Sequence, residues 1–243
     1  MKDRIDRLLV TLGHFESRAS ARAAIEAGRV RVDGEVVSKP SQEVVIGARI
    51  EAEAAHPYVS RGGLKLAHGL EAFSVDPFGR ACLDIGASTG GFTDVLLRRG
   101  ARHVVAVDVG HGQLHHSLQG SERVTSLEST DARTLTAADL PDPPTLLVCD
   151  ASFISLEKLL EVPLSLAAPG ADFVGLFKPQ FQVGRENIGK GGLVTDEAAA
   201  DAAAERFADW MKEKGWPILA WTASPISGGD GNAERLFHAR KTQ

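Results

Sequence analysis

From residue 60 onward, short apolar runs alternate with amphipathic stretches, which is typical of strands that alternate with helices. The helical stretches follow Gly90, Ser155 and Asp196. This alternation favours a mostly parallel sheet with helices on both faces, so we expect a Rossmann-like α/β domain in residues 60–243. We expect Pro163 to break the helix that follows Ser155. The seven predicted strands are Ala81–Ile85, Val104–Val109, Val124–Leu127, Thr145–Asp150, Asp172–Lys178, Ile218–Ser224 and Leu236–Arg240. A glycine-rich turn joins the last two, which predicts an antiparallel edge strand.

Residues 1–53 show a different pattern. Apolar residues spaced i, i+3, i+4, i+7 from Ile5 predict a short amphipathic helix. Ser17 is a good N-cap for a second helix that stops at Gly28. The alternation in RVRVDGEVV, with its central DG, predicts a β-hairpin. We therefore expect a small α+β domain, joined to the larger one by a linker at residues 54–59.

Composition excludes several classes of protein. The chain has 243 residues, a net charge of -5 and 43% hydrophobic residues, which argues against a wholly basic protein that coats nucleic acid. Cys82 and Cys149 lie in apolar runs, so we expect buried thiols in a reducing, cytoplasmic setting. The N-terminus lacks the apolar core of a signal peptide, and no run approaches the ~18 apolar residues of a spanning helix. We therefore expect no membrane association.

The stretch CLDIGASTGGFTDVLLRRG predicts a ligand-binding loop between a strand and a helix. Glycine there lets the backbone approach a ligand, and an acid at the end of the next strand can accept both hydroxyls of a ribose. The spacing G-x-x-x-G-G differs from the dinucleotide pattern G-x-G-x-x-G, so we favour S-adenosylmethionine. Ordinary turn glycines and helix caps are the alternative. The predicted cofactor residues are Asp84, Gly86, Ser88, Thr89, Gly90, Gly91, Asp108 and, for the adenine, Asp131.

Four charged residues lie at predicted strand or helix ends: Lys65, Asp150, Lys178 and Glu234. Lys178 ends an apolar strand, where desolvating an ammonium is unfavourable. Each residue alone has a simpler explanation, such as a helix cap or a solvated chain end. Together, two lysines and two carboxylates on one rim of the sheet can satisfy one another, so they are candidate catalytic residues.

Arginines gather in the N-terminal region. Arg18 and Arg22 share a helix face, and Arg29 and Arg31 share a strand face. Such a surface suits phosphates, although acidic residues are nearly as numerous and a solvated face is the alternative. The predicted RNA-binding residues are Arg4, Arg7, Arg18, Arg22, Arg29 and Arg31.

The pattern SR-x-x-A…I-x-x-G-x-V-x-V-x-G…KP resembles the S4 domain, an RNA-binding module. Residues 60–243 resemble the FtsJ-like 2'-O-ribose methyltransferases through SRGGLKL, DIGASTGGFTDVLL, VVAVDVGHGQL, CDASFISL, FKPQFQVG and GNAERLF. The whole chain resembles the TlyA, or hemolysin A, family of ribosomal RNA methyltransferases. It departs from the family pattern at Gln182, where we expect glutamate, and at His111, where we expect tyrosine. The resemblance places the family's catalytic tetrad on Lys65, Asp150, Lys178 and Glu234.

The resemblance implies methylation of ribosomal RNA at the ribose 2'-hydroxyl, with S-adenosylmethionine as cofactor and ribosomal RNA or ribosomal subunits as partners. We expect Lys178 to act as the general base or to orient the hydroxyl, with Lys65 as a second cation beside it. Asp150 and Glu234 would then hold the two lysines in place.

Several alternatives stay open. They are a non-catalytic ribosome assembly factor, a membrane-active hemolysin and a dinucleotide oxidoreductase. The glycine spacing argues against the last of these. The cluster His111, His115 and His116 has no cysteine or carboxylate at ligand spacing, so we expect no metal site. The target nucleotide, the oligomeric state and any closing of the loop at residues 184–195 stay undecided.

Overall fold

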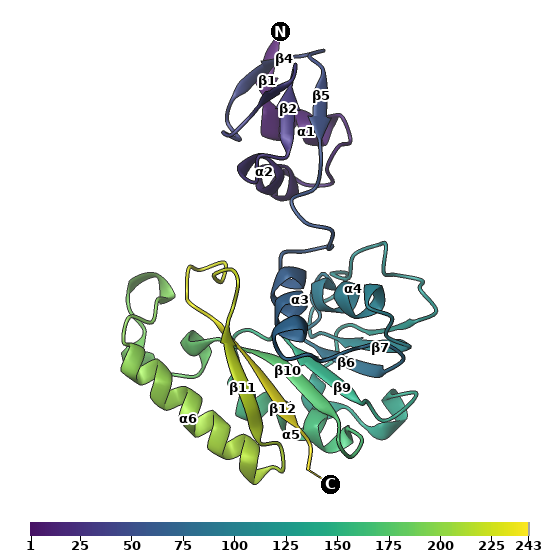
Figure 1. Cartoon of the computed structure of the whole chain (residues 1–243), viewed down its shortest axis with the longest axis vertical. Coiled ribbons are helices and arrows are strands. Elements are labelled where there is room, and N and C mark those ends of the chain that lie inside the picture. The colour runs from purple at the N-terminus through teal and green to yellow at the C-terminus, as the bar shows by residue number, and fades with distance from the viewer. Residues whose placement is uncertain (243) are drawn as a thin grey trace. The chain divides into compact units, whose positions relative to one another are not determined.

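The structure, a computed structural model, describes residues 1–242. The chain divides into two compact units, Met1–Pro57 and a second that begins at Tyr58 (Figure 1). Each unit has its own buried apolar core, as separate domains do. Within residues 1–242, no helix is both long and apolar enough to cross a membrane.

The N-terminal unit packs two helices against short strands. Its elements are β1 (Lys2–Arg4), α1 (Ile5–Thr11), α2 (Arg18–Glu26), β2 (Val30–Val32), β3 (Glu35–Val36), β4 (Glu43–Val45) and β5 (Ile50–Ala52). The Oγ of Ser17 accepts a hydrogen bond from the Ser20 amide at 3.2 Å, which confirms the predicted cap of α2. Asp33 and Gly34 take φ angles of 52° and 87°, as the two-residue hairpin turn between β2 and β3 requires.

The larger unit is a seven-stranded sheet with the order β11-β12-β10-β9-β6-β7-β8. Its elements are α3 (Gly62–Ala72), β6 (Ala81–Ile85), α4 (Gly91–Arg98), β7 (His103–Val107), β8 (Val124–Leu127), β9 (Leu146–Cys149), α5 (Leu156–Leu166), β10 (Asp172–Phe177), α6 (Glu197–Glu213), β11 (Ile218–Ala223) and β12 (Arg235–Arg240). The five strands from β10 to β8 are parallel. This confirms the Rossmann-like α/β class.

The antiparallel strand is not at the edge of the sheet. Strand β12 runs antiparallel to both β10 and β11 and lies between them, so β11 forms the edge. All of the side chains of β12 from Leu236 to Ala239 are buried, which an edge strand would not achieve. The sheet therefore contains an antiparallel strand, as predicted, but that strand is not at the edge, so its predicted position was wrong.

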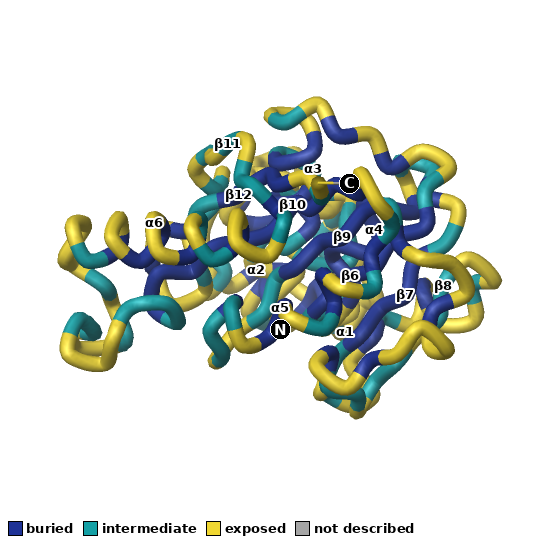
Figure 2. Tube along the Cα trace, turned by 90° about the horizontal axis from the view of Figure 1, so that it is seen from below, coloured by how far each residue is buried: buried dark blue, intermediate teal, exposed yellow. Residues whose placement is uncertain are grey.

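Helices cover both faces of the sheet. Apolar side chains of α3 and α4 pack on one face, for example Leu66 and Val95, and those of α5 and α6 pack on the other, for example Leu160 and Phe207. Figure 2 shows the central strands β6, β9 and β10 as mainly buried between these layers. Burial on both faces explains why these strands are continuous apolar runs rather than alternating ones.

Pro163 does not break its helix, so that expectation was wrong. Helix α5 continues through Pro163 to Leu166. A proline removes only one backbone hydrogen bond from the helix, and α5 ends within a turn of it. The burial of Leu160 and Leu164 on the core side holds the helix together across this gap.

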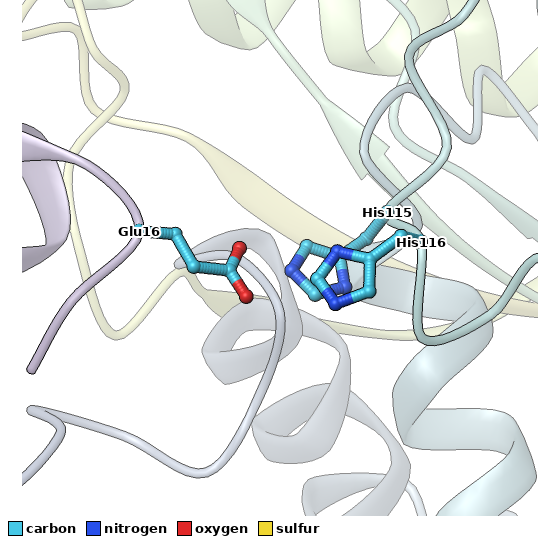
Figure 3. Close-up of side chains that lie close together, drawn as sticks. All are labelled: Glu16, His115 and His116. Atoms are coloured by element: carbon cyan, nitrogen blue, oxygen red, sulfur yellow. The ribbon is translucent and has the colours of Figure 1, made fainter. Parts of the chain in front are cut away.

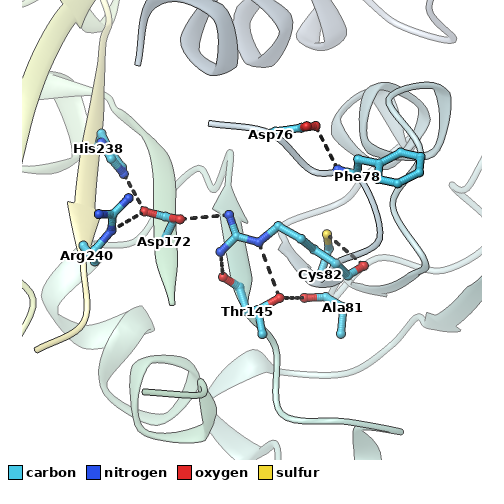
Figure 4. Close-up of polar contacts among 9 residues, drawn as sticks. Asp76, Phe78, Ala81, Cys82, Thr145, Asp172, His238 and Arg240 are labelled. Atoms are coloured by element: carbon cyan, nitrogen blue, oxygen red, sulfur yellow. Dashed lines mark hydrogen bonds and ion pairs between the residues drawn. The ribbon is translucent and has the colours of Figure 1, made fainter. Parts of the chain in front are cut away.

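A buried carboxylate ties the sheet together at the start of β10, away from the carboxyl ends of the parallel strands. Asp172 accepts hydrogen bonds from Arg80 at 2.8 Å, His238 at 2.9 Å and Arg240 at 2.9 Å (Figure 4). Burial alone would raise the pKa of Asp172, but hydrogen bonds from these three partners outweigh it and hold the pKa below its usual range. Arg80 also bonds Thr145, so the cluster joins the beginnings of several strands.

Candidate active site

The site lies where the strand order of the sheet reverses. From β6 the chain proceeds to β7 and β8 on one side, and then returns to β9 and β10 on the other. The crevice beyond the carboxyl ends of β6 and β9 is the place where open α/β sheets bind ligands. The loop from Gly86 to Gly91 follows β6, and Asp150 follows β9.

Two glycines of this loop are required by its shape. Gly86 has a φ of 80°, and a Cβ there would lie 3.1 Å from the carbonyl oxygen of Asp150. Gly90 has a φ of 89°, and a Cβ there would overlap the side chain of Leu118. L-residues rarely adopt such angles, so the close approach of the two chain segments depends on glycine at both positions.

A cavity of about 590 Å³ lies beside the loop. Gly86, Ser88, Asp108 and Asp131 line it, together with apolar residues such as Ile154. Asp108 accepts hydrogen bonds from the Ser88 amide at 2.8 Å and the Gly110 amide at 2.7 Å, so its carboxylate is held between the two loops. Four of the eight predicted cofactor residues therefore share this cavity.

The other four lie elsewhere around the loop. Thr89 and Gly91 line an adjoining cavity, Gly90 shapes the turn, and Asp84 is fully buried beneath it. The Asp84 carboxylate accepts a hydrogen bond from the Thr93 hydroxyl at 2.6 Å, which joins β6 to α4 across the loop. Asp84 therefore supports the loop from beneath.

Burial raises the pKa of Asp84 to about 7, against the opposing hydrogen bond from Thr93, and the neighbouring charge of Asp150 adds to the rise. An unfolded carboxyl titrates near 3.9, so between about pH 4 and pH 7 the unfolded chain has lost a proton that the folded protein keeps. The contribution of Asp84 to stability therefore falls as pH rises through this range.

We predict that Asp84→Asn weakens this pH dependence, because an amide can still accept from Thr93 but carries no charge. Urea unfolding at pH 5 and pH 8, followed by tryptophan fluorescence, measures the effect. The wild-type protein should lose more stability between these pH values than the variant does. An identical loss in both would show that Asp84 does not titrate in this range.

The four candidate catalytic residues form two ion pairs. Lys65 of α3 lies 2.5 Å from Glu234, and Lys178, after β10, lies 2.6 Å from Asp150 (Nζ to carboxylate oxygen). The Lys65 and Glu234 side chains are only 10% and 2% exposed. Burial raises the pKa of Glu234 above its usual value, although the hydrogen bond and the charge of Lys65 oppose this rise. The set combines two ammonium and two carboxylate groups, so little net charge is buried when all are ionised.

Ser152 joins this cluster, although sequence reasoning missed it. Lys178 donates a hydrogen bond to its Oγ at 2.9 Å. Ser152 lines three cavities: the one of about 590 Å³ beside the loop, one of about 230 Å³ with Lys65 and Asp150, and one of about 450 Å³ with Gln180. The only signal in the sequence is a small polar residue just after the strand LLVC, which by itself is common in loops.

Asn232 was also missed. It is buried, its amide nitrogen donates to the Gly192 carbonyl at 3.0 Å, and its oxygen accepts from the Val194 amide at 2.9 Å. These bonds fasten the glycine-rich loop to the segment that carries Glu234. Gln182, the departure from the family pattern, accepts from the Leu156 amide at 3.0 Å and so satisfies a free N–H in the first turn of α5.

The histidine-rich segment holds two neighbouring rings that are tilted against each other. The rings of His115 and His116 have centroids 4.4 Å apart at an angle of 31° (Figure 3). His111 is exposed in the same loop. Within residues 58–242, no three His, Cys, Asp or Glu side chains lie close enough together to hold a metal ion.

The predicted arginine surface of the N-terminal unit is only partly a cluster. Arg4 and Arg18 both bind the buried carboxylate of Asp6. Arg22 is exposed one turn after Arg18 on α2. The remaining three have separate partners: Arg7 with Asp3 at 3.2 Å, Arg29 with Glu53 at 3.5 Å and Arg31 with the Gly34 carbonyl at 3.1 Å.

Comparison with known proteins gives the same two parts. The FtsJ-like methyltransferase family matches residues 58–241, and the S4 domain matches residues 3–50. The 16S/23S rRNA (cytidine-2'-O)-methyltransferase TlyA of Mycobacterium tuberculosis is 45% identical over 239 residues, which are 98% of this chain and 89% of that protein.

Two further relatives bear the name hemolysin. Hemolysin A of Brachyspira hyodysenteriae is 36% identical over 236 residues, which are 97% of this chain and 98% of that protein. The solved structure of a hemolysin from Streptococcus thermophilus is 38% identical and has a TM-score of 0.78, with 100% of this chain and 89% of that chain covered. The chain belongs to the family of FtsJ-like methyltransferases with an S4 domain that includes TlyA and hemolysin A.

Proposed function

We propose that this protein transfers the methyl group of S-adenosylmethionine to the 2'-hydroxyl of a cytidine ribose in ribosomal RNA. One observation carries the proposal: the two lysine–carboxylate pairs lie where the cofactor cavity adjoins two further cavities, at the carboxyl ends of β6, β9 and β10. The name of the M. tuberculosis relative supports the choice of cytidine and of ribosomal RNA.

The residues around the cofactor cavity fit S-adenosylmethionine. A volume of about 590 Å³ is within the range of small-molecule sites. Each oxygen of the Asp108 carboxylate accepts one backbone hydrogen bond and keeps a lone pair for a ribose hydroxyl. Gly86 lets the backbone at Asp150 and Ala151 approach the loop, which shapes the wall of this cavity. The bound cofactor supplies an electrophilic methyl carbon attached to a sulfonium.

Asp108→Ala should weaken S-adenosylmethionine binding, because the ribose hydroxyls lose their acceptor. The unsatisfied hydroxyls cost about 1–3 kcal/mol, or roughly 5- to 150-fold in affinity. Calorimetric titration measures this, with Asp139→Ala as a control that removes an exposed carboxylate bonded to Thr136. An unchanged affinity would remove Asp108 from the cofactor site.

Lys178 acts on the ribose hydroxyl. Asp150 and Ser152 hold its Nζ at the junction of the cavities, where a hydroxyl can lie between the lysine and the cofactor cavity. To act as the base, Lys178 must first give up the proton of its ammonium group; the amine then takes the hydroxyl proton as the new oxygen–carbon bond forms. Lys65, held by Glu234, supplies positive charge beside the oxygen. Holding that oxygen in line with the methyl carbon adds to the rate independently of proton transfer.

The base of the target nucleotide occupies the cavity of about 450 Å³. The base is attached to the sugar carbon next to the one that bears the 2'-hydroxyl, so it must lie close to Lys178. This cavity is lined by Lys178 and Glu234 and by Phe181, an aromatic surface on which a base can stack. It adjoins the cofactor cavity at Ser152 and Phe153.

Methylation of ribosomal RNA tests the proposed function. Full-length protein, labelled S-adenosylmethionine and ribosomal subunits from cells without this gene should yield 2'-O-methylcytidine on nucleoside digestion and mass spectrometry. Mapping of the modified position would name the nucleotide and the subunit. A methyl group found on a base, or no transfer to either subunit, would overturn the proposal.

A further inference from the structure

The N-terminal unit contains a buried charge that the proposed chemistry does not use. Asp6 lies in the first turn of α1, and its side chain is fully buried. Arg4 donates to both of its oxygens, through Nε at 3.1 Å and Nη2 at 3.0 Å. Arg18, at the first position of α2, donates to the same carboxylate at 2.7 Å. The Asp6 carboxylate thus joins Arg4, two residues before it in the sequence, to Arg18, twelve residues after it.

The two arginines remain accessible. Their side chains are 46% and 54% exposed, although the carboxylate between them is not exposed at all. A guanidinium has five N–H donors, more than either arginine uses on Asp6. The hydrogen bond from Arg4, opposed by burial and aided by Arg18, lowers the pKa of Asp6 to about 2, so the carboxylate is ionised at neutral pH. The cluster therefore keeps one net positive charge.

A half-exposed arginine usually moves among many rotamers, and ordering it on a ligand costs free energy. Asp6 has already ordered both side chains through charge-assisted hydrogen bonds. Two guanidinium groups converging on one point suit the oxygens of a phosphate, which accept hydrogen bonds from planar arginine forks.

We propose that Asp6 is a positioning residue that holds Arg4 and Arg18 as a pre-ordered clamp for one phosphate of the RNA backbone. This inference rests on the proposed RNA substrate. It assigns a binding role to an acidic residue that a charge count would treat as unfavourable for RNA. Asp6 itself does not touch the RNA; it acts through the two arginines.

Asp6→Asn separates the proposal from simple electrostatics, because the two predict opposite signs. Removal of a negative charge from a basic surface should tighten RNA binding if only net charge matters. If Asp6 orders the clamp, its loss should weaken binding. We expect a weakening of roughly 5- to 150-fold, from the cost of ordering two free arginine side chains.

The matched control is Asp3→Asn. Asp3 lies in the same unit and pairs with Arg7 at 3.2 Å, but it is partly exposed and contacts one guanidinium. The two variants change the charge equally. We therefore expect Asp3→Asn to bind RNA as tightly as wild type or more tightly. The inference is overturned if Asp6→Asn binds as tightly as Asp3→Asn does.

A double-mutant cycle distinguishes positioning from a structural role. In an Arg4→Gln/Arg18→Gln background, Asp6→Asn should no longer weaken RNA binding, because there is no clamp left to order. An equal loss in both backgrounds would show that Asp6 only supports the fold.

Arg4→Lys, which keeps the positive charge but not the planar guanidinium, provides a second test if Asp6→Asn unfolds. It should weaken binding at a temperature where circular dichroism shows that the variant is folded, and wild-type affinity there would overturn the inference.

The experiment uses the full-length protein and in vitro transcribed 16S and 23S ribosomal RNA, with binding measured by filter retention at several salt concentrations. S-adenosylmethionine affinity is measured in parallel and should not change in any variant. Failure of the wild-type protein to bind either RNA would overturn the proposed RNA substrate, and the clamp with it. Wild-type binding combined with an unaffected Asp6→Asn variant would overturn the clamp alone.

Discussion

Lys178→Ala should lower the rate of methyl transfer by ~10²–10⁴, the usual contribution of a positioned general base, and by more if the hydroxyl also loses its orientation. The variant keeps Asp108 and the glycine loop, so S-adenosylmethionine affinity should change by no more than a few fold. RNA affinity should likewise survive, because the arginines of the N-terminal unit are untouched. Single-turnover methylation, with calorimetry for the cofactor, separates these quantities.

Lys178→Arg decides what kind of group the reaction needs. A guanidinium keeps the positive charge and can still bond Asp150, but it stays protonated at any accessible pH. We therefore expect no rescue of the rate. Near wild-type methylation by this variant would exclude general base catalysis and leave Lys178 as a cation that polarises the hydroxyl. Lys214→Ala is a suitable control, since it removes an exposed lysine paired with Glu161 on the surface.

Asp172→Asn should destabilise the larger unit by about 3–5 kcal/mol, the usual effect of removing one partner from a buried ion pair. The carboxylate is 9% exposed and holds Arg80, His238 and Arg240 together, so its loss leaves Arg80 without its charged partner in a mostly buried position. All three tryptophans, at 210, 216 and 221, lie in this unit, so urea unfolding followed by their fluorescence reports on it alone. Asp142→Asn, at an exposed pair with Arg102, should change stability by less than about 0.5 kcal/mol.

The difference in stability between wild type and Asp172→Asn should also depend on pH. Because the folded-state pKa of Asp172 lies below that of an unfolded carboxyl, its stabilising contribution is complete above about pH 4 and is lost as pH falls further. The difference in unfolding free energy between wild type and Asp172→Asn should therefore shrink toward pH 2–3. A difference that stays constant from pH 7 to pH 3 would mean that the carboxylate charge contributes nothing.

Local structure could be read from the chain because it depends on neighbouring residues. The strands from Ala81 and Val124, the cap at Ser17 and the DG hairpin all follow from side-chain periodicity and from backbone angles that few residues tolerate. The candidate site could be located in outline as well. Charged residues at the ends of apolar strands are costly unless they meet partners, and in a parallel sheet those ends lie on one edge.

Partners far apart in sequence could not be read in this way. Lys65 pairs with Glu234 across 169 residues, and Lys178 pairs with Asp150; charge alone would have allowed the opposite assignment. The insertion of β12 between β10 and β11 brings Glu234 to Lys65. This insertion could not be predicted, because the glycine-rich turn before β12 does not indicate which of the last two strands forms the edge. The junction of three cavities at Ser152 arises only when the loops after three strands converge.

Asp6 and Pro163 show the physical reason most directly. In sequence, Asp6 is one more acid in a basic region, and Pro163 is a helix breaker. The packing of α1 on α2 buries Asp6 between two arginines, and the packing of α5 on the sheet outweighs one lost hydrogen bond at Pro163. The sequence by itself determined the periodicities, the caps and the chemistry at the strand ends. Only the tertiary structure decided which charges meet and which local rules are overridden, because burial energies depend on contacts that form once the chain has folded.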